Sequence, residues 1–346
     1  CYKKLSMSKK NSNVILKDGF KNYEELSDIY SLFKKKLNSF KKNSFLIAVS
    51  GGPDSLALTA LAKSYSYENK CKIYYVLVDH NLRKNSSKEA KSVKKLLKKH
   101  QITLNILKNK KPIEKNIQSE ARMVRYNLLK SFCKKKKIKT ILTAHNLEDQ
   151  VETFFIRLSR GSGLHGLSSM RPINKIEDGI NLIRPLLDFK KIELIKISKL
   201  IFGRYYKDPT NRNTKYLRTR IRNLQESLET SGINYDQVIR SIRNLSSSRD
   251  TLDQYFNKIY KNTVKKRNNI IVINLKNFNK INQEMKMRVF KKAIKDFTKA
   301  YYSIRSKKIF NLIDKIKVRK NAKLTLGGCI VSREKNCITL KKEMKN

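Results

Sequence analysis

The stretch SFLIAVSGGPDSLAL, residues 44–58, decides the fold. Its apolar first part predicts a buried strand over residues 45–50, and the apolar pattern after Pro53 predicts a helix over residues 53–62. Small polar residues lie between them, where open α/β sheets bind ligands beyond the carboxyl ends of their strands. The stretch therefore predicts a ligand-binding loop at the edge of a parallel sheet.

The loop itself has the chemistry of a phosphate cradle. Two glycines let the backbone approach an anion, the next helix points free N–H groups at it, and two serines add hydroxyl donors. The sequence has neither the Walker pattern G-x-x-x-x-G-K-[ST] nor G-x-G-x-x-G here. Asp54 is unusual beside phosphate unless a cation or a specific hydrogen bond occupies it. A glycine-rich turn without a ligand is the alternative interpretation.

The segments that follow keep the alternation of strand and helix. Three further predicted strands cover residues 72–80, 102–108 and 140–145, and the helices between and after them cover residues 86–100, 117–136 and 147–161. Short apolar strands separated by helices predict an α/β fold with a parallel, doubly wound sheet. Beyond it we expect a short strand over residues 183–187 and helices over residues 189–201 and 216–228.

Composition and pattern divide the chain into four predicted parts. These are a basic N-terminal tail and leading helix (1–43), a catalytic α/β domain (44–230), a helical segment (231–265) and a small α+β C-terminal domain (266–346). In the last part we expect a strand over 270–275, helices over 281–297 and 303–317, and strands over 323–332 and 336–341.

The charge of the chain indicates a polyanionic partner. Lys and Arg number 79 against 28 Asp and Glu, a formal net charge of +51. So large a charge repels itself unless a partner such as nucleic acid neutralises it. The alternative is a genome-wide bias toward Lys and Asn.

Composition also limits the class of protein. A hydrophobic fraction of 39% is enough for a core, and no apolar run approaches the roughly 20 residues of a membrane helix. The N-terminus does not have the pattern of a signal peptide; Met7 is a candidate start, and a longer parent chain is the alternative. The cysteines form no Cys-x-x-Cys pair, which predicts a reduced, cytoplasmic compartment; they are Cys1, Cys71, Cys133, Cys329 and Cys337.

The SGGPDS loop resembles the pyrophosphatase loop of the N-type ATP pyrophosphatases (the PP-loop superfamily). That superfamily binds the pyrophosphate of ATP and activates an oxygen by adenylation. Further segments resemble one branch, the tRNA(Ile)-lysidine synthases. They are VDHNLRKNSSKEA (78–90), SEARMVRYNLL (119–129), TAHNLEDQVETFFIRLSRGSGLHGLSSM (143–170), IRPLLDFKKIEL (183–194) and KDPTNRNTKYLRTRIRNLQESLE (207–229), with a weaker match in 325–343.

The resemblance implies the adenine nucleotide alpha hydrolase-like fold and a two-step reaction. ATP adenylates the C2 oxygen of the wobble cytidine in tRNA(Ile) with a CAU anticodon, and the ε-amine of free L-lysine then displaces AMP. ATP and magnesium are the implied cofactors, tRNA and lysine the implied partners, and no membrane is involved. The helical segment and the C-terminal domain would bind tRNA. The oligomeric state stays open, with a homodimer among the possibilities.

The resemblance and the strand ends together select the candidate site residues. Those expected to bind ATP are Ser50, Gly51, Gly52, Pro53, Asp54, Ser55, Val78, His80, Ala144 and His145. Those expected to act in catalysis or to orient lysine are Asp54, Asp149, Glu152 and Arg218, with Asp54 also the candidate magnesium ligand. Those expected to contact phosphate or tRNA are Arg122, Arg125 and Arg222. The alternative for Asp149 and Glu152 is a solvated acidic helix face together with Glu148. The alternative for Arg122 and Arg125 is a salt bridge with Glu120 or another neighbour.

The chain departs from the family pattern at three positions. The usual T-A-H-H-x-D-D-Q reads TAHNLEDQ here, so Asn146 replaces a histidine and Glu148 an aspartate. Asn146 can donate a hydrogen bond but cannot titrate, whereas Glu148 keeps the charge with a longer reach. Thr210 stands where the family usually has serine.

Two other functions stay open from the sequence. A PP-loop tRNA thiolase would need a cysteine pair or an iron–sulfur site near the loop, and Cys71 and Cys133 could approach each other in space despite their spacing. A non-catalytic basic RNA-binding protein would not need Asp54, Asp149 and Glu152.

Overall fold

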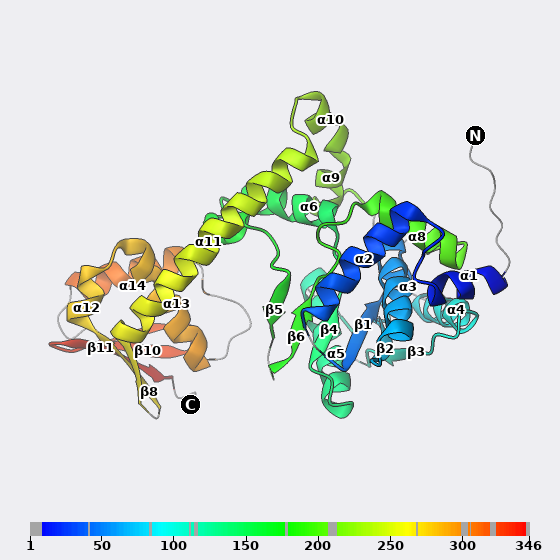
Figure 1. The fold of residues 1–346 in the computed structure, drawn as a ribbon. Coiled ribbons are helices and arrows are strands. Elements are labelled where there is room, and N and C mark those ends of the chain that lie inside the picture. Colours follow the sequence, from blue (N-terminus) through cyan, green and yellow to red (C-terminus); the bar gives the residue numbers. More distant parts are fainter. Residues whose placement is uncertain are drawn as a thin grey trace. The chain divides into compact units, whose positions relative to one another are not determined.

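A computed structural model describes most of the chain (Figure 1). The described residues are 9–40, 42–82, 85–110, 112–113, 117–176, 179–206, 213–267, 269–298, 304, 306–318 and 323–343. Cys1, Met7 and Thr210 lie outside them. The chain forms two compact units, Cys1–Leu245 and Ser246–Asn346. The finer boundaries near residues 230 and 265 stay predictions.

The first unit is built on a mainly parallel sheet. Its strands, among the described residues, are β1 (Ser44–Val49), β2 (Lys72–Asp79), β3 (Leu104–Lys108), β4 (Thr140–Leu142), β5 (Ile173–Lys175) and β6 (Asn181–Ile183). The order is β3-β2-β1-β4-β6-β5, with every neighbouring pair parallel except β5 and β6. Because the chain moves outward from β1 through β2 and β3 and then returns to β4, the switch point of the sheet lies between β1 and β4.

Alternate side chains of the strands enter two cores on opposite faces of this sheet. In β1, Phe45, Ile47 and Val49 belong to the larger core, whereas Leu46 packs with Tyr126 on the other face. The larger core is covered by α1 (Lys9–Lys17), α2 (Glu24–Asn38), α3 (Pro53–Glu68), α4 (Ser86–Lys98) and α8 (Lys191–Phe202), and the other face by α5 (Ile117–Lys135). Helices on both faces confirm the predicted doubly wound α/β fold.

A smaller cluster fixes the helix that follows β4. Leu147 and Val151 of α6 (Leu147–Leu158) pack against Tyr235, Val238 and Ile239 at the start of α11 (Tyr235–Thr263). The intervening short helices are α7 (Leu164–Leu167), α9 (Leu217–Asn223) and α10 (Gln225–Thr230). The cluster therefore fixes the amino half of α6, which follows β4 in the chain, against the start of α11.

The second unit is α+β, as predicted. Its described strands are β7 (Val264–Arg267), β8 (Ile270–Asn274), β9 (Lys323–Leu326), β10 (Cys329–Arg333) and β11 (Cys337–Lys342), all antiparallel in the order β7-β8-β11-β10-β9. The helices are α12 (Leu275–Lys280), α13 (Gln283–Thr298), α14 (Ser306–Val318) and the end of α11. Buried Phe290 and Val331 join the helices and the sheet in one core.

Several predicted elements were wrong in detail. The strand predicted over 183–187 is β6, which ends at Ile183 before Pro185. The strand predicted over 323–332 is a hairpin, because Gly327 and Gly328 turn the chain with φ of 63° and 79°. The helix predicted over 216–228 is divided into α9 and α10. Over the part of the chain that the structure describes, no helix is both long and apolar enough to cross a membrane.

Candidate active site

The SGGPDS loop lies between β1 and α3 and is closed by its own serine. The Ser55 hydroxyl oxygen accepts the backbone N–H groups of Ser50 and Gly51, each at 3.1 Å, and donates to the Gly52 carbonyl at 3.0 Å. Gly51 has φ of 84°, and a Cβ there would lie 2.6 Å from Val93 Cγ2. The loop is therefore preformed, and Pro53 begins α3 directly after it.

Asp54 lies in the first turn of α3 with one carboxylate oxygen unused. Burial raises its pKa to about 6; Lys191 and a hydrogen bond from Asn146 oppose this shift, and Asp149 adds to it. Oδ1 is buried and has no hydrogen-bond partner among the described residues. A buried carboxylate oxygen of this kind is a fitting partner for a cation at the loop.

The donor set around Asp54 fits magnesium better than a metal held by protein alone. Within the described ranges, no group of three or more His, Cys, Asp or Glu side chains could hold a metal ion. Magnesium commonly uses one or two carboxylates together with substrate phosphates and water. Asp54 can supply such a carboxylate beside the phosphate cradle.

The two departures that lie among the described residues, Asn146 and Glu148, accept backbone N–H groups at helix amino ends. The Asn146 side chain accepts the Asp149 backbone N–H at 2.9 Å, and Asp149 Oδ2 accepts the Asn146 N–H at 3.1 Å, which forms a capping box on α6. The two carboxylate oxygens of Glu148 accept the Lys191 backbone N–H at 3.0 and 2.9 Å. Glu148 thus ties α6 to the amino end of α8.

Two acids of α6 and two arginines of α9 form one network, here called the acid–arginine network (Asp149, Glu152, Arg218 and Arg222). Arg218 Nη2 donates to Asp149 Oδ1 and Arg218 Nε to Glu152 Oε2, both at 2.6 Å. Arg222 Nε donates to Glu152 Oε1 at 2.7 Å. The Glu152 side chain is 3% exposed and Asp149 19%. All four carboxylate oxygens accept hydrogen bonds, and the larger exposed fraction of its side chain makes Asp149 the more accessible acid.

A second group at the same edge carries arginines and histidines, here called the basic group (His80, Arg122, Arg125, His145 and Arg184). Burial and Arg125 lower the pKa of His80 to about 4, although Asp79 opposes them. Arg125 Nε donates to His80 Nε2 at 3.3 Å, which is consistent with a neutral ring.

His145 is held neutral in the same way. Burial first, and then the charges of Arg184 and Arg122, keep its pKa well below the usual range. Thr143 Oγ1 lies 3.0 Å from His145 Nδ1. Arg122, whose guanidinium lies 5.1 Å from the centre of the Tyr126 ring, completes this side. The predicted strand-end histidines and α5 arginines are therefore brought together.

Arg184 belongs to this group and was missed from the sequence. It follows β6 directly, and its side chain is buried. Burial lowers its pKa, as do the charges of Arg122 and Arg157. Arg184 could have been recognised as a strand-end residue, because it directly follows β6, which pairs with β4. The predicted strand over 183–187 instead placed Arg184 inside a strand.

The side chains of two residues predicted to bind ATP pack against different cores. Val78 packs on the α5 face of the sheet and Ala144 on the opposite face, so these side chains do not meet. Cys71 and Cys133 likewise lie in cores on opposite faces, and burial raises the pKa of both thiols, that of Cys133 to about 12. This arrangement gives no support to a catalytic cysteine pair.

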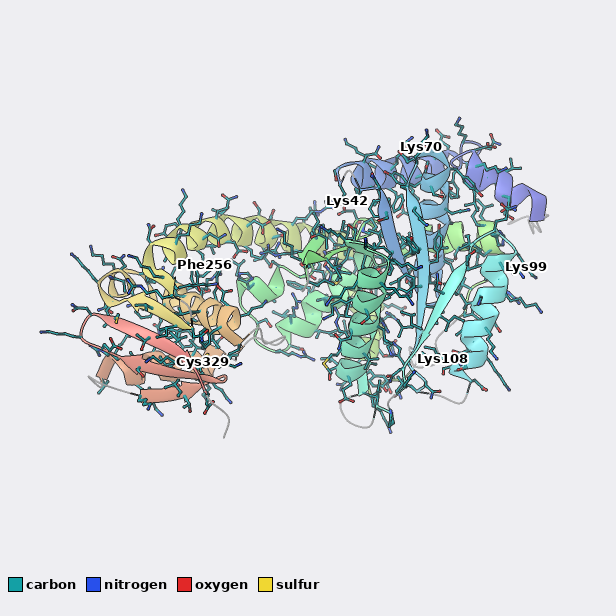
Figure 2. All side chains as sticks on the ribbon, turned by 90° about the horizontal axis from the view of Figure 1, so that it is seen from below. Lys42, Lys70, Lys99, Lys108, Phe256 and Cys329 are labelled. Atoms are coloured by element: carbon teal, nitrogen blue, oxygen red, sulfur yellow. The ribbon has the colours of Figure 1, made fainter. Side chains whose placement is uncertain are left out.

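A cavity of about 360 Å³ lies away from the loop. Its lining includes Lys42 and Lys70, labelled in Figure 2, together with Asn43 and Cys71. These residues precede β1 and β2, so the cavity is at the amino edge of the sheet, whereas the loop, Asp54 and both groups of charged residues are at the carboxyl edge. Strand-end chemistry, and not this cavity, defines the candidate site.

The loop, its Asp and the switch point of the sheet define a PP-loop protein, and the PP-loop domain family matches residues 26–227. The tRNA(Ile)-lysidine synthase of Wolbachia pipientis wMel is 33% identical over 87% of this chain and 72% of its own length. That of Wolbachia sp. subsp. Brugia malayi (strain TRS) is 30% identical over 91% and 75%. The chain belongs to the tRNA(Ile)-lysidine synthase family.

A solved structure supports the fold alone. The U34-tRNA thiolase NcsA from Methanococcus maripaludis, with its [4Fe-4S] cluster, superposes with a TM-score of 0.54 at 18% identity. The match covers 64% of this chain and 80% of that one.

Proposed function

We propose that this protein is an ATP-dependent carbon–nitrogen ligase that joins lysine to C2 of the wobble cytidine of tRNA(Ile) with a CAU anticodon. The observation that carries the proposal is the convergence of a preformed PP-loop, Asp54 with its unused oxygen, and the acid–arginine network at one sheet edge. Membership of the lysidine synthase family supports the same reaction.

In the first step the cytidine C2 oxygen attacks the α-phosphate of ATP. A phosphorus–oxygen bond forms as the bond to pyrophosphate breaks, leaving adenylated tRNA. The loop and the amino end of α3 orient the leaving pyrophosphate through N–H groups. Asp54 would hold magnesium, and the ion would supply positive charge to the phosphates.

In the second step the ε-amine of free L-lysine attacks C2, and AMP leaves. The attacking nitrogen must be neutral, so the lysine ammonium has to pass a proton to a base, and the accessible Asp149 carboxylate is the candidate acceptor. Asp149 is accessible enough to orient the incoming cation, whereas Glu152 acts through Arg218 and Arg222 as a positioning residue. Arg218 lies between the two acids, where it can face the reacting centre.

RNA binding accounts for the charge of the chain. A net charge of +51 suits a protein that displaces counterions from a phosphate backbone. The parts at 231–265 and 266–346 would contribute to binding tRNA. A cytoplasmic location belongs to this proposal, because it is where tRNA and ATP are available.

The proposal is tested with purified protein, ATP, magnesium, radiolabelled lysine and two tRNA transcripts. We expect labelled lysine in the CAU transcript and none in a transcript with uridine at the wobble position. Asp54→Asn should reduce tRNA-dependent pyrophosphate release by about a hundredfold or more. Sulfur incorporation without lysine would favour the thiolase. No tRNA-dependent pyrophosphate release would favour a non-catalytic RNA-binding protein.

A further inference from the structure

Arg184 is a buried guanidinium with no anionic partner in the part of the chain that the structure describes. The residue is 4% exposed. Nη1 donates to the Arg171 carbonyl at 2.7 Å, but Nε is buried without any hydrogen-bond partner, and no carboxylate within the described ranges pairs with the charge. A buried charge left unpaired is strongly destabilising, so the local structure is incomplete without a counter-ion.

The surroundings of Arg184 add positive charge. The positive charges of Arg122 and Arg157 lower the pKa of Arg184. After burial, the charge of Arg184 is the largest contribution to the lowered pKa of His145. Arg157 is already engaged with the carbonyls of Gly166 and Ser169. Arg122 contacts the Tyr126 ring and, among the residues described, forms no ion pair. Neither Arg184 nor Arg122 is therefore paired with an acid in the described segments.

We propose that Arg184 and Arg122 form an oxyanion subsite beside His145 that takes a phosphate group of a substrate. A guanidinium presents N–H donors in a fork that matches phosphate oxygens. Two guanidinium charges, that of buried Arg184 and that of exposed Arg122, suit phosphate better than a single carboxylate, which would neutralise one of them. The proposal rests on the proposed function, in which both ATP and the tRNA backbone carry phosphate.

The subsite separates substrates by charge. A phosphate enters the basic group, while the lysine ammonium meets the acid–arginine network at Asp149. Phosphate binding would supply the counter-ion that Arg184 lacks, so binding should stabilise the folded chain. The two phosphate sources are distinguished by which substrate loses affinity when the charge is removed.

The test uses Arg184→Met, which removes the charge but keeps much of the volume, and Arg184→Lys, which keeps the charge without the fork. Arg220→Met is the matched control, because Arg220 is exposed on α9. The measurements are Tm without ligand and with magnesium pyrophosphate, Kd for a non-hydrolysable ATP analogue and for the tRNA transcript, and KM for lysine.

We expect Arg184→Met to have a ligand-free Tm equal to or above that of the unmodified protein, and to lose the Tm increase caused by pyrophosphate or by tRNA. Kd should rise by at least about tenfold for one of the two phosphate substrates, with KM for lysine within about twofold. The Kd of Arg184→Lys for the same substrate should lie between those of the unmodified protein and of Arg184→Met. A rise confined to the ATP analogue assigns the subsite to the nucleotide, and a rise confined to tRNA assigns it to the RNA backbone.

Three results would overturn the subsite. They are an unchanged Kd for both phosphate substrates, an effect confined to lysine, and a lower ligand-free Tm with normal binding. If Arg184→Met did not fold, Arg122→Gln, at an exposed position, should weaken the same substrate, and unchanged binding there would also overturn it. A protein that binds phosphate through Arg184 but makes no lysidine would refute the proposed reaction alone.

Discussion

The two groups of arginines at the carboxyl edge of the sheet are in opposite electrostatic situations. In the acid–arginine network, Arg218 and Arg222 donate to Asp149 and Glu152 at 2.6–2.7 Å. In the basic group, Arg184 is more deeply buried yet, within the described residues, has no acid. The arginine charges of the first group are therefore balanced without a ligand. In our proposal, the charge of Arg184 in the second group is balanced only when an anion binds.

Because of this difference, removal of one charge should change the free energy of unfolding in opposite directions in the two groups. Removing a charge from the network leaves its partner unpaired, which destabilises the fold. Removing the charge of Arg184 removes the energetic cost of an unpaired buried charge, so the ligand-free fold should be equally stable or more stable. The comparison fails if both changes have the same sign, and the following substitutions test it from the largest expected effect to the smallest.

Glu152→Gln should have the largest effect. Glu152 is 3% exposed and accepts from both Arg218 and Arg222, so its neutral replacement should lower the free energy of unfolding by about 2 to 4 kcal/mol. Urea denaturation measures this change. Glu226→Gln on exposed α10 is the control and should leave stability unchanged. A stable Glu152→Gln protein would show that the network is not structural.

The same variant tests the role of Glu152 in the reaction. We expect Glu152→Gln, at a temperature where it is folded, to slow lysine transfer more than adenylation of tRNA. Accumulation of adenylated tRNA, measured with α-labelled ATP in the absence and presence of lysine, separates the two steps. An equal loss of both would contradict a role on the lysine side.

Arg218→Lys should have a smaller effect. The planar guanidinium spans Asp149 and Glu152 at once, which an ammonium group cannot do with the same geometry. We expect a loss of about 1 to 2 kcal/mol in unfolding free energy and a higher KM for lysine. Arg222→Lys, which replaces a single contact, should cost less. Equal costs for the two variants would count against the bridging role.

Much of the site could be predicted because strand ends are readable from sequence. The SGGPDS loop, His80 and His145 follow apolar strands, and parallel strands bring their carboxyl ends to one edge. The spacing of Asp149 and Glu152 placed them on one helix face, and the structure adds that their partners come from α9.

The features that the sequence did not predict depend on where strands end and on contacts between residues far apart in the chain. Arg184 was missed because residues 183–187 are apolar apart from this arginine and a proline, so the strand was drawn past its end at Ile183. The hairpin at Gly327 was read as a single strand because its apolar pattern continues through the turn. The link from Glu148 to the Lys191 N–H joins residues 43 apart, which periodicity does not reveal.

Asn146→Ala should have the smallest effect, and it tests what holds the network in place. Asn146 caps α6 and pairs reciprocally with Asp149, so its loss should cost about 1 kcal/mol of unfolding free energy. Asn146→Ser restores a capping oxygen and should recover most of this stability, which urea denaturation can resolve. If the alanine and serine variants were equally unstable, capping would not explain the departure from the family's histidine. If neither variant changed the free energy of unfolding, Asp149 would be held in place by Arg218 alone. The geometry of the acid–arginine network would then depend on α9 and not on the capping of α6.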